Sequence, residues 1–571
     1  MDLEEWLGHY MKDCELGRGP YRHPEYKDLP EVTLSAPTET GQMASIPVLN
    51  QQSYTGRKPV IPSALANTLC ADLGISGLLE KFNTALGTSY NQLTGGVCSV
   101  LEDCILKNYD FGTAYAHLRP FWNHFKFKKK LATIVDELSN REVRHQKMLQ
   151  DVLVEDKILV SYVPPRRIWD LCSNRVVSWP VARQEWGRQC LWGISHAWMD
   201  KEDREDVLTP INGYEWPVPI PKDTSLDLIR IEMLNLGEEY AWLDVLCLRQ
   251  TGGIREDLRE EEWKVDVPTI GNVYRDAERV VCYLSGLGRP LSFNADDFGN
   301  DRCWFKRAWT LQEISKDPIV GGNTGDEELQ ARFQKKLSSL QHTTLGLYQV
   351  LSEMQKRVST NPMDKVAGMA YPLHSKSIPA YYEEQSEEDA WIALVNATER
   401  TSQGNLLFMY PEPGNGNRFW RPSWNQVMSE KLPTEYPFIY FSDPHARIGI
   451  DSHYHAYSIE SAFVRGLSKR DSQGQKRQGE LAVKDCTGTE WIFKIVARHQ
   501  YPIPDGSYTL LGDISFDNST ICWVVGWRLS DQRLKKLSVF EMYEEDMKAE
   551  ARMESLMSWG IATEAYNTFL A

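Results

Sequence analysis

The chain has 571 residues, of which 42% are hydrophobic and 11% are aromatic, a composition that excludes a wholly disordered protein. A single hydrophobic core does not extend over such a length, so we expect about two to four domains. The formal net charge of −16 excludes a general nucleic-acid binder, because such a protein needs a basic surface against the phosphates.

The sequence shows neither a membrane span nor a secretory signal. No apolar run is long enough to cross a bilayer, and residues 1–6 are acidic where a signal peptide is basic. The 11 cysteines share no repeated spacing and form no C-x-x-C pair, which argues against a zinc finger or a redox dithiol. We therefore expect a soluble, cytoplasmic protein with no metal site and no resident cofactor.

Two regions are predicted in the N-terminal part. Residues 1–60 are rich in Pro, Gly, Thr and charged residues without a sustained period, which indicates an extended arm. Residues 61–157 contain runs with helical spacing at 64–69, 75–86 and 112–138, which indicate an α-helical domain.

Residues 158–325 alternate apolar runs of strand length with segments of helical period, which predicts an α/β domain around a parallel sheet. In such a sheet, ligands bind beyond the carboxyl ends of the strands, where Ser195, His196 and Arg249 fall. The expected strands are 158–163, 190–195, 241–248, 279–285 and 318–320. The expected helices are 224–236, 255–278 with a break at Pro268, and 303–314.

The segment 303–314 contains neither Pro nor Gly and is predicted to form a helix. Trp309 and Glu313 are then i,i+4 neighbours, so that an aromatic ring and a carboxylate share one face. Gln312 widens this face, since it lies three residues after Trp309. The alternative is an amphipathic helix with Trp304 and Trp309 in the core and Glu313 in a solvated last turn.

The C-terminal part is predicted to contain a helical connecting region and a β-rich domain. Residues 326–435 carry leucine and methionine at helical spacing. Residues 436–571 contain several apolar runs of strand length, with a predicted closing helix at 539–556.

Between about residues 158 and 320 the chain carries a series of sequence blocks. They read Pro-Arg-Arg at 165–167 with Asp170, Ile-Ser-His-Ala-Trp at 194–198, Tyr-Ala-Trp-Leu-Asp-Val-Leu-Cys-Leu-Arg-Gln at 240–250, Gly-Asn-Val-Tyr-Arg-Asp-Ala at 271–277, and Arg-Ala-Trp-Thr-Leu-Gln-Glu at 307–313. In content and order they resemble the fungal heterokaryon-incompatibility (HET) domain. The family's usual first block reads Leu-Ser-Tyr-x-Trp-Gly. This chain departs from it, since His196 replaces the Tyr and Met199 replaces the Gly.

The resemblance implies a role in fungal non-self recognition, in which the domain induces programmed cell death. The HET family is in turn similar to TIR domains, which share a flavodoxin-like parallel sheet with helices on both faces. Many TIR domains cleave NAD between nicotinamide and ribose with a helical Glu in a Trp-Cys-Leu-x-Glu segment, and residues 309–313 have the same spacing. The resemblance therefore implies a TIR-like centre, NAD as substrate, Glu313 as catalytic residue, and a homo-oligomer or a protein partner on activation.

Cleavage of an N-glycosidic bond passes through an oxocarbenium-like state, which a carboxylate stabilises. In this implied chemistry, Glu313 offsets the developing positive charge, and Trp198 or Trp309 stacks on a ring of the nucleotide. The other expected substrate-binding residues are Ser195, His196 and Asp244, together with Arg249 and Arg307 for the pyrophosphate.

These residues also have structural interpretations. Asp244 lies in a run that looks buried, so its carboxylate must be paired, either with substrate or with a neighbouring loop or Arg307. Arg249 and Arg307 are equally ordinary as surface ion-pair residues. Ser195 and His196 do not form a nucleophile–base pair by themselves, because successive side chains of a strand point apart, and their block lacks the last Gly of a nucleophile elbow.

The sequence leaves three functions open. The first is a cell-death effector that hydrolyses NAD or a related nucleotide at the N-glycosidic bond and is activated by assembly. The second is a non-catalytic signalling module that binds a protein partner with the same surface. The third is an enzyme of secondary metabolism that reuses the fold. Glu313 separates the first two, because only catalysis requires its carboxylate when the fold is intact.

Overall fold

The computed structural model describes residues 26–41, 53–94, 96–122, 131–160, 162–182, 191–292, 301–313, 318–322, 325–340, 346–375, 377–429, 432, 447–448, 453–470, 476–514, 520–542 and 549–571. The chain divides into two compact units, of which the first contains residues 1–343 and 378–383 and the second contains residues 344–377 and 384–571. Most of the arm predicted at 1–60 lies outside the described residues. In the described part, no helix is both long and apolar enough to cross a membrane.

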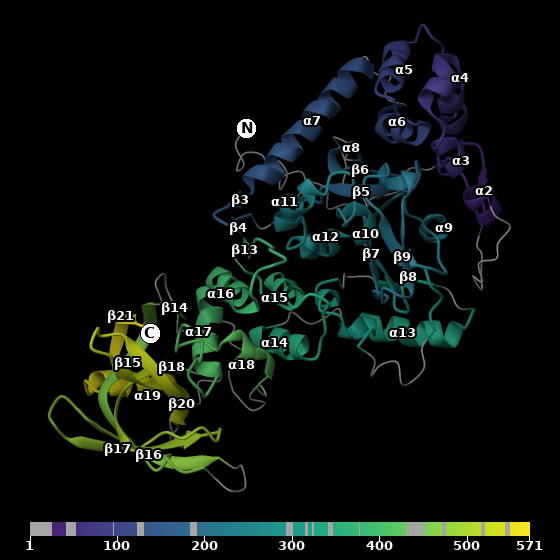
Figure 1. Cartoon of the computed structure of the whole chain (residues 1–571). Coiled ribbons are helices and arrows are strands. Elements are labelled where there is room, and N and C mark those ends of the chain that lie inside the picture. Colours follow the sequence, from purple (N-terminus) through teal and green to yellow (C-terminus); the bar gives the residue numbers. More distant parts are fainter. Residues whose placement is uncertain are drawn as a thin grey trace. The chain divides into compact units, whose positions relative to one another are not determined.

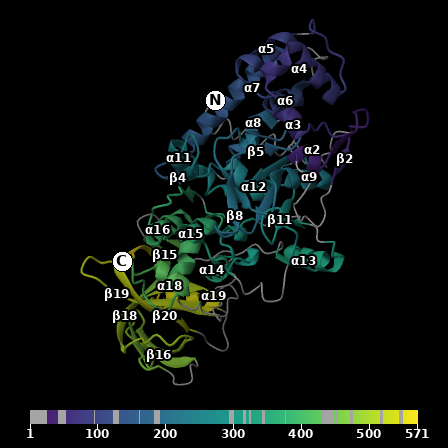
Figure 2. The ribbon, with the colours of Figure 1, turned by 45° about the vertical axis from the view of Figure 1, so that its right-hand side comes forward.

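The N-terminal part of the first unit is mainly helical. Figures 1 and 2 show α4, α5 and α6 beside one another, and the rings of Phe82 and Trp122 stack in their shared core with 4.4 Å between centroids. The elements are β1 (Val32–Leu34), α2 (Ala36–Thr40), β2 (Tyr54–Gly56), α3 (Ser63–Ala66), α4 (Cys70–Leu86), α5 (Val97–Leu106), α6 (Phe111–Leu118) and α7 (Leu131–Asp151). Helices therefore occupy much of the stretch for which the sequence predicts them.

A mixed six-stranded sheet forms the centre of the first unit (Figure 1). Its strand order is β12 (Pro318–Val320), β11 (Val280–Tyr283), β7 (Trp192–His196), β10 (Tyr240–Leu243), β5 (Arg167–Asp170) and β6 (Arg175–Ser178). The first four strands are parallel, whereas β5 and β6 are antiparallel to their neighbours. The predicted α/β class is confirmed, and the antiparallel pair at one edge is a feature that the sequence did not predict.

Strand β7 lies where the order of the parallel strands reverses. The chain runs from β7 through α9 (Leu226–Leu236) to β10 on one side, and then through α11 (Asp257–Asp266) and α12 (Ile270–Asp276) to β11 on the other. The two crossovers cover opposite faces of the sheet. Tyr274 of α12 packs against Gly193, whereas Tyr283, which points to the other face, donates a hydrogen bond to Glu232 of α9 at 2.8 Å.

Two predicted strands differ in the structure. The strand predicted at 158–163 is wrong, because β4 (Lys157–Ile158) pairs with β3 (Leu153–Val154) and β13 (Ile378–Pro379) in a separate small sheet. Pro164 and Pro165 follow closely and have no N–H for a ladder. The strand predicted at 241–248 ends at Leu243, because the Asp244 carboxylate accepts the N–H of Val245 at 2.8 Å and begins the short helix α10 (Asp244–Cys247).

The helix predicted at 303–314 is wrong over its described part, which ends at Glu313. Two short 3₁₀ turns, η4 (Trp304–Lys306) and η5 (Trp309–Leu311), replace it. The Thr310 hydroxyl lies 2.8 Å from the carbonyl oxygens of both Trp304 and Arg307, and such side-chain bonds compete with the backbone bonds of an α-helix. The remaining elements of this unit are α8 (Trp179–Ala182), β8 (Arg204–Val207), η2 (Pro210–Asn212), β9 (Val218–Pro221) and α13 (Glu327–Leu340).

The second unit combines helices with an antiparallel sheet that closes on itself, because β15 pairs with both β16 and β18. Met553 and Leu556 of α19 pack into its core. The helix predicted at 539–556 is wrong in extent: β20 runs to Met542, and a strand follows α19. The elements are α14 (Leu347–Gln355), α15 (Met363–Ala370), α16 (Glu387–Ala397), α17 (Arg400–Met409), α18 (Trp424–Ser429), β14 (Arg447–Ile448), β15 (His453–Arg465), β16 (Arg477–Lys484), β17 (Glu490–Ala497), β18 (Gly506–Ile514), β19 (Ile521–Arg528), β20 (Leu534–Met542), α19 (Ala549–Ser558) and β21 (Thr563–Phe569).

Candidate functional site

Four of the predicted site residues gather at the carboxyl ends of β7 and β10. Ser195 and His196 are the last two residues of β7, and Asp244 follows directly after β10. Glu313 follows η5 and reaches the end of β7 from there. Because side chains alternate along a strand, Ser195 and His196 point to opposite faces, and each meets its own carboxylate.

Ser195 joins two side chains of the segment 301–313. Its Oγ donates a hydrogen bond to Glu313 Oε2 at 2.5 Å and accepts one from Trp304 Nε1 at 2.7 Å. Ser195 and Trp304 are fully buried, and Glu313 is 9% exposed. Hydrogen bonds that involve a charged group are strong in such a low-dielectric environment, so this cluster holds the Glu313 carboxylate against the end of β7.

His196 forms the second pair, with Asp244. Its Nε2 lies 2.9 Å from Asp244 Oδ1, and its Nδ1 lies 3.4 Å from the carbonyl oxygen of Ala197. Both ring nitrogens therefore face acceptors, which suits the imidazolium form. Burial lowers the pKa of His196, but the carboxylates of Asp244 and Glu313 outweigh burial, so that the pKa lies above its ordinary value.

The accessible side of this site is formed by Asp244 and Trp198. The Asp244 side chain is 20% exposed, against 5% for His196. The ring of Trp198 lies 5.5 Å from that of His196. The guanidinium group of Arg204 lies over the same Trp198 ring, 5.3 Å from its centroid. A ligand that approaches from solvent therefore meets a carboxylate and an indole ring first.

The other predicted residues occupy different surroundings. Arg249 is only 3% exposed and pairs with the exposed Glu215 at 2.8 Å and with Glu262 at 3.3 Å, so its guanidinium group is buried, unlike that of the surface ion-pair residue predicted as the alternative. The ring of Trp309 lies 6.5 Å from that of Tyr381. Arg307 is partly buried between the two 3₁₀ turns. With no continuous helix, Trp309 and Glu313 do not share the helical face that the sequence predicts.

Sequence reasoning missed the polar role of two aromatic residues. Trp304 was predicted as a core side chain, and it is buried, but its indole N–H also holds Ser195. The hydroxyl of Tyr274 donates to the carbonyl oxygen of Ile194 at 3.0 Å and braces β7 from α12. The sequence gives one signal for Tyr274, which is that it lies inside the block at 271–277 that resembles the HET domain.

The site offers two carboxylates, one hydroxyl and one imidazole ring at a single sheet end. A carboxylate held in a dry environment is able to stabilise positive charge on a reacting sugar, and a partly exposed one is able to accept hydrogen bonds from hydroxyl groups. An imidazolium between two acceptors positions its carboxylate partner rather than accepting a proton. Among the described residues, no group of three or more His, Cys, Asp or Glu is arranged to hold a metal ion.

Fold and site together define a mixed α/β protein with a polar site at the switch point of its parallel strands. The family model described as "Heterokaryon incompatibility protein (HET)" matches residues 192–297. The matched region begins with β7 and contains Ser195, His196 and Asp244, and it ends before Trp304 and Glu313. The resemblance is thus confirmed for this stretch: residues 192–297 are similar to the HET region of heterokaryon-incompatibility proteins. Searches of curated proteins and of solved structures found no significant match.

Proposed function

We propose that this protein is a cytoplasmic effector of fungal non-self recognition and cell death, whose first unit cleaves the N-glycosidic bond of NAD or a related nucleotide. The meeting of the Ser195–Glu313 and His196–Asp244 pairs at the ends of β7 and β10 carries the proposal. Open α/β sheets bind their ligands at such a switch point. The similarity of residues 309–313 to the TIR segment supports a TIR-like centre and the choice of Glu313 as the catalytic carboxylate.

In the proposed reaction, the bond between ribose C1′ and the nicotinamide nitrogen breaks, and its electron pair stays with the nitrogen. The ribose becomes oxocarbenium-like, and the Glu313 carboxylate stabilises this charge. Water then adds to C1′, and its proton passes through Glu313 to solvent. The products are nicotinamide, ADP-ribose and a proton. Before the reaction, Ser195 holds the carboxylate in the closed conformation through its hydrogen bond at 2.5 Å.

The partly exposed residues of the site hold the substrate. Asp244 accepts hydrogen bonds from the ribose hydroxyl groups, and the imidazolium of His196 fixes its carboxylate in place. Trp198 stacks on an aromatic ring of the nucleotide. Arg307 receives the pyrophosphate, whereas Arg249 is already paired with Glu215 and Glu262 and takes no part in this reaction.

Catalysis by Glu313 requires that the segment 301–313 moves. In the described conformation the carboxylate is 9% exposed and bound by Ser195, so a ribose has no access to it. Opening breaks the hydrogen bonds of Ser195 with Glu313 and Trp304. We expect self-association to supply the free energy for opening, which makes the activity depend on protein concentration.

The burial of the same cluster favours a second candidate, a non-catalytic signalling module that binds a protein partner. Ser195, Glu313 and Trp304 satisfy one another by hydrogen bonds inside the protein, as a structural polar cluster does. In that case Glu313 contributes to stability alone, and the HET region acts through its surface.

The test measures nicotinamide release from NAD by the purified full chain over a range of protein concentrations, with and without a crowding agent. Glu313→Gln keeps the size of the side chain and removes its charge. Glu232→Gln is the matched control, since Glu232 accepts hydrogen bonds from Tyr283 and Gly322 on the opposite face of the same sheet. Thermal melting of each variant verifies the fold.

Release that rises with concentration, disappears in Glu313→Gln and persists in Glu232→Gln would establish the hydrolase. The absence of release from a well-folded protein under every condition would reject it in favour of the signalling module. Equal release by wild type and Glu313→Gln would leave a hydrolase in which Glu313 has no catalytic role.

A further inference from the structure

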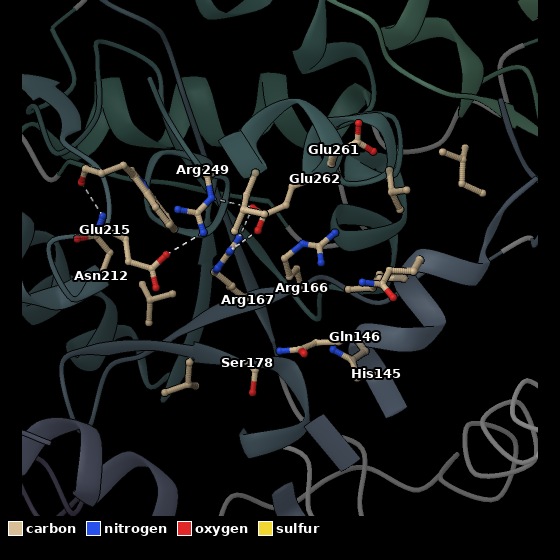
Figure 3. Close-up of a pocket in the computed structure, with 18 residues that line it drawn as sticks. His145, Gln146, Arg166, Arg167, Ser178, Asn212, Glu215, Arg249, Glu261 and Glu262 are labelled. Carbon is tan, nitrogen blue, oxygen red and sulfur yellow. Dashed lines mark hydrogen bonds and ion pairs between the residues drawn. The ribbon is translucent and has the colours of Figure 1, made fainter. Parts of the chain in front are cut away.

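The first unit contains a cavity of about 720 Å³ that the proposed reaction does not use. It lies between α7, the β5–β6 edge of the sheet, α11 and the segment 212–216 (Figure 3). Ser195, His196, Asp244 and Glu313 do not line it. Its volume is within the range of sites for small organic molecules.

Arginine side chains line one part of this cavity (Figure 3). Arg166 holds Asp266 through two hydrogen bonds of 2.7 and 3.0 Å, and Arg167 holds Glu262 through two of 2.9 and 2.7 Å. Such forked pairs fix the guanidinium planes. Because each of these cations already has a carboxylate partner, the cavity has little spare positive charge and disfavours a multiply charged anion.

Arg249 differs from the other two arginines, because its hydrogen bonds are incomplete. Its Nη2 binds Glu215 at 2.8 Å and its Nε binds Glu262 at 3.3 Å, while its Nη1 is buried with no hydrogen-bond partner among the described residues. A buried donor of a charged group without an acceptor is costly, by about 1–3 kcal/mol or more. Arg249 lines the cavity and is 3% exposed, so a ligand in the cavity is the available source of the missing acceptor.

Trp216 keeps this part of the cavity rigid. The guanidinium groups of Arg249 and Arg167 lie 5.0 and 5.1 Å from its ring centroid, and its indole N–H donates to the carbonyl oxygen of Val245 at 3.1 Å. A second polar atom, Asn212 Oδ1, is also buried without a partner among the described residues. It is an acceptor, so it complements a hydroxyl or N–H group on the same ligand.

Another part of the wall is aliphatic and consists of Leu149, Leu153, Val176, Val177, Leu258 and Val265. Polar side chains also line the cavity, namely His145, Gln146, Gln150, Ser178 and Glu261. A cavity that combines an apolar wall with a few polar groups binds a molecule with an apolar body and a polar end. The unpaired guanidinium nitrogen of Arg249 selects an oxygen acceptor at that end, and the paired charges of the lining disfavour more than one negative charge.

We propose that this cavity binds a small organic acid, whose carboxylate meets Arg249 and whose apolar body lies against the aliphatic wall. The ligand joins α7 to the edge of the sheet, because residues of both line the cavity. This site is independent of the proposed hydrolase, and it exists whether or not Glu313 is catalytic.

The experiment uses the full chain and three probes that share one ring. 4-Hydroxybenzoate has a carboxylate and a hydroxyl group, 4-hydroxybenzamide is its neutral counterpart, and phenyl phosphate carries up to two negative charges. Isothermal titration calorimetry and thermal melting measure binding at millimolar probe. We expect 4-hydroxybenzoate to bind and to raise the melting temperature, with both other probes weaker.

Two variants locate the site. Arg249→Lys keeps the charge but removes Nη1, and Leu258→Trp fills the cavity at a half-buried position. Each should weaken 4-hydroxybenzoate by about tenfold or more, the loss expected for one charged hydrogen bond or for a blocked cavity. Arg289→Lys, which alters an arginine paired with Asp223 outside the cavity, is the control and should bind as wild type does.

Failure of 4-hydroxybenzoate to bind, or unchanged affinity in the folded Leu258→Trp protein, would overturn the proposal. If 4-hydroxybenzamide bound as well as 4-hydroxybenzoate, the ligand would not need a carboxylate, and that part of the proposal would be wrong. If phenyl phosphate bound best, the ligand would be a phosphate ester and not an organic acid. None of these results depends on nicotinamide release, so the two proposals fail separately.

Discussion

His499 gives the second unit a defined sensitivity to acid. Its Nε2 donates a hydrogen bond to the carbonyl oxygen of Val539 at 2.7 Å, and its Nδ1 accepts the N–H of Tyr501 at 3.2 Å. The neutral ring is therefore fully paired, and a proton on Nδ1 would face another N–H. Burial lowers the pKa of His499 to about 4, with the charges of Arg477 and Lys536 adding to the effect against the Val539 hydrogen bond.

The magnitude follows from the two pKa values. An unfolded histidine titrates near pH 6.5, so between pH 6.5 and 4 the unfolded chain binds a proton that the folded chain does not. A shift of about 2.5 units corresponds to ~3 kcal/mol of unfolding free energy. The stabilisation is fully present above pH 6.5 and is lost as the pH falls through 6.5 towards 4. Roughly 2.5 kcal/mol of it is gone at pH 4.5.

The assay compares wild type with His499→Gln, which keeps a side-chain donor and an acceptor. Denaturant unfolding at pH 7 and pH 4.5, followed by hydrogen exchange in β20, reports the second unit. Between pH 7 and pH 4.5, the unfolding free energy of the variant should fall by roughly 2.5 kcal/mol less than that of wild type. His117→Gln, in the first unit, is the control for the substitution. On acidification, its stability measured by hydrogen exchange in β20 should fall as much as that of wild type. The same acid sensitivity in wild type and His499→Gln would refute the reasoning.

Two further predictions concern packing in the first unit. Arg119→Met removes the buried cation that pairs with Asp170 at 3.0 Å and Glu239 at 2.9 Å, and the two carboxylates left behind should cost about 3–5 kcal/mol in denaturant unfolding. Wild-type stability in that variant would contradict the buried ion pairs. Gly193→Ala places a Cβ 2.8 Å from Tyr274 Cδ1, so we expect overpacking to cost about 1–3 kcal/mol, measured by thermal melting. An unchanged melting temperature would mean that Tyr274 moves aside without cost.

Elements with strong local signals could be predicted from the sequence. The helix predicted at 224–236 is confirmed as α9, whose stripe of apolar residues ends at Gly237 with a φ of 110° that glycine adopts easily. The break predicted at Pro268 separates α11 from α12, because proline lacks the N–H that a continuous helix needs. In both cases a single residue, Gly237 or Pro268, determines where the helix stops.

Elements decided by distant contacts could not be predicted. Residues 303–313 have helical composition, but Thr310 donates to backbone carbonyl oxygens of Trp304 and Arg307. The Trp304 indole is held by Ser195, more than one hundred residues earlier in the chain. Asp244 is predicted within a buried strand, and instead it is the first residue of the short helix α10, where its carboxylate accepts the N–H of Val245 and meets His196. The residues next to Trp304 and Asp244 in the sequence do not indicate that their partners are Ser195 and His196.

The pairing within the site follows from the alternation of side chains along β7. Ser195 and His196 are adjacent, so they point to opposite faces of the strand, and a bond between them is excluded by geometry. Each therefore engages a carboxylate from a different element: Ser195 binds Glu313 from the turn after η5, and His196 binds Asp244 from the end of β10. The same argument that removes a serine hydrolase from consideration thus accounts for a site with two separately held carboxylates. Glu313 is buried and the Asp244 side chain is partly exposed, so a ligand reaches Asp244 first and reaches Glu313 after the segment 301–313 opens.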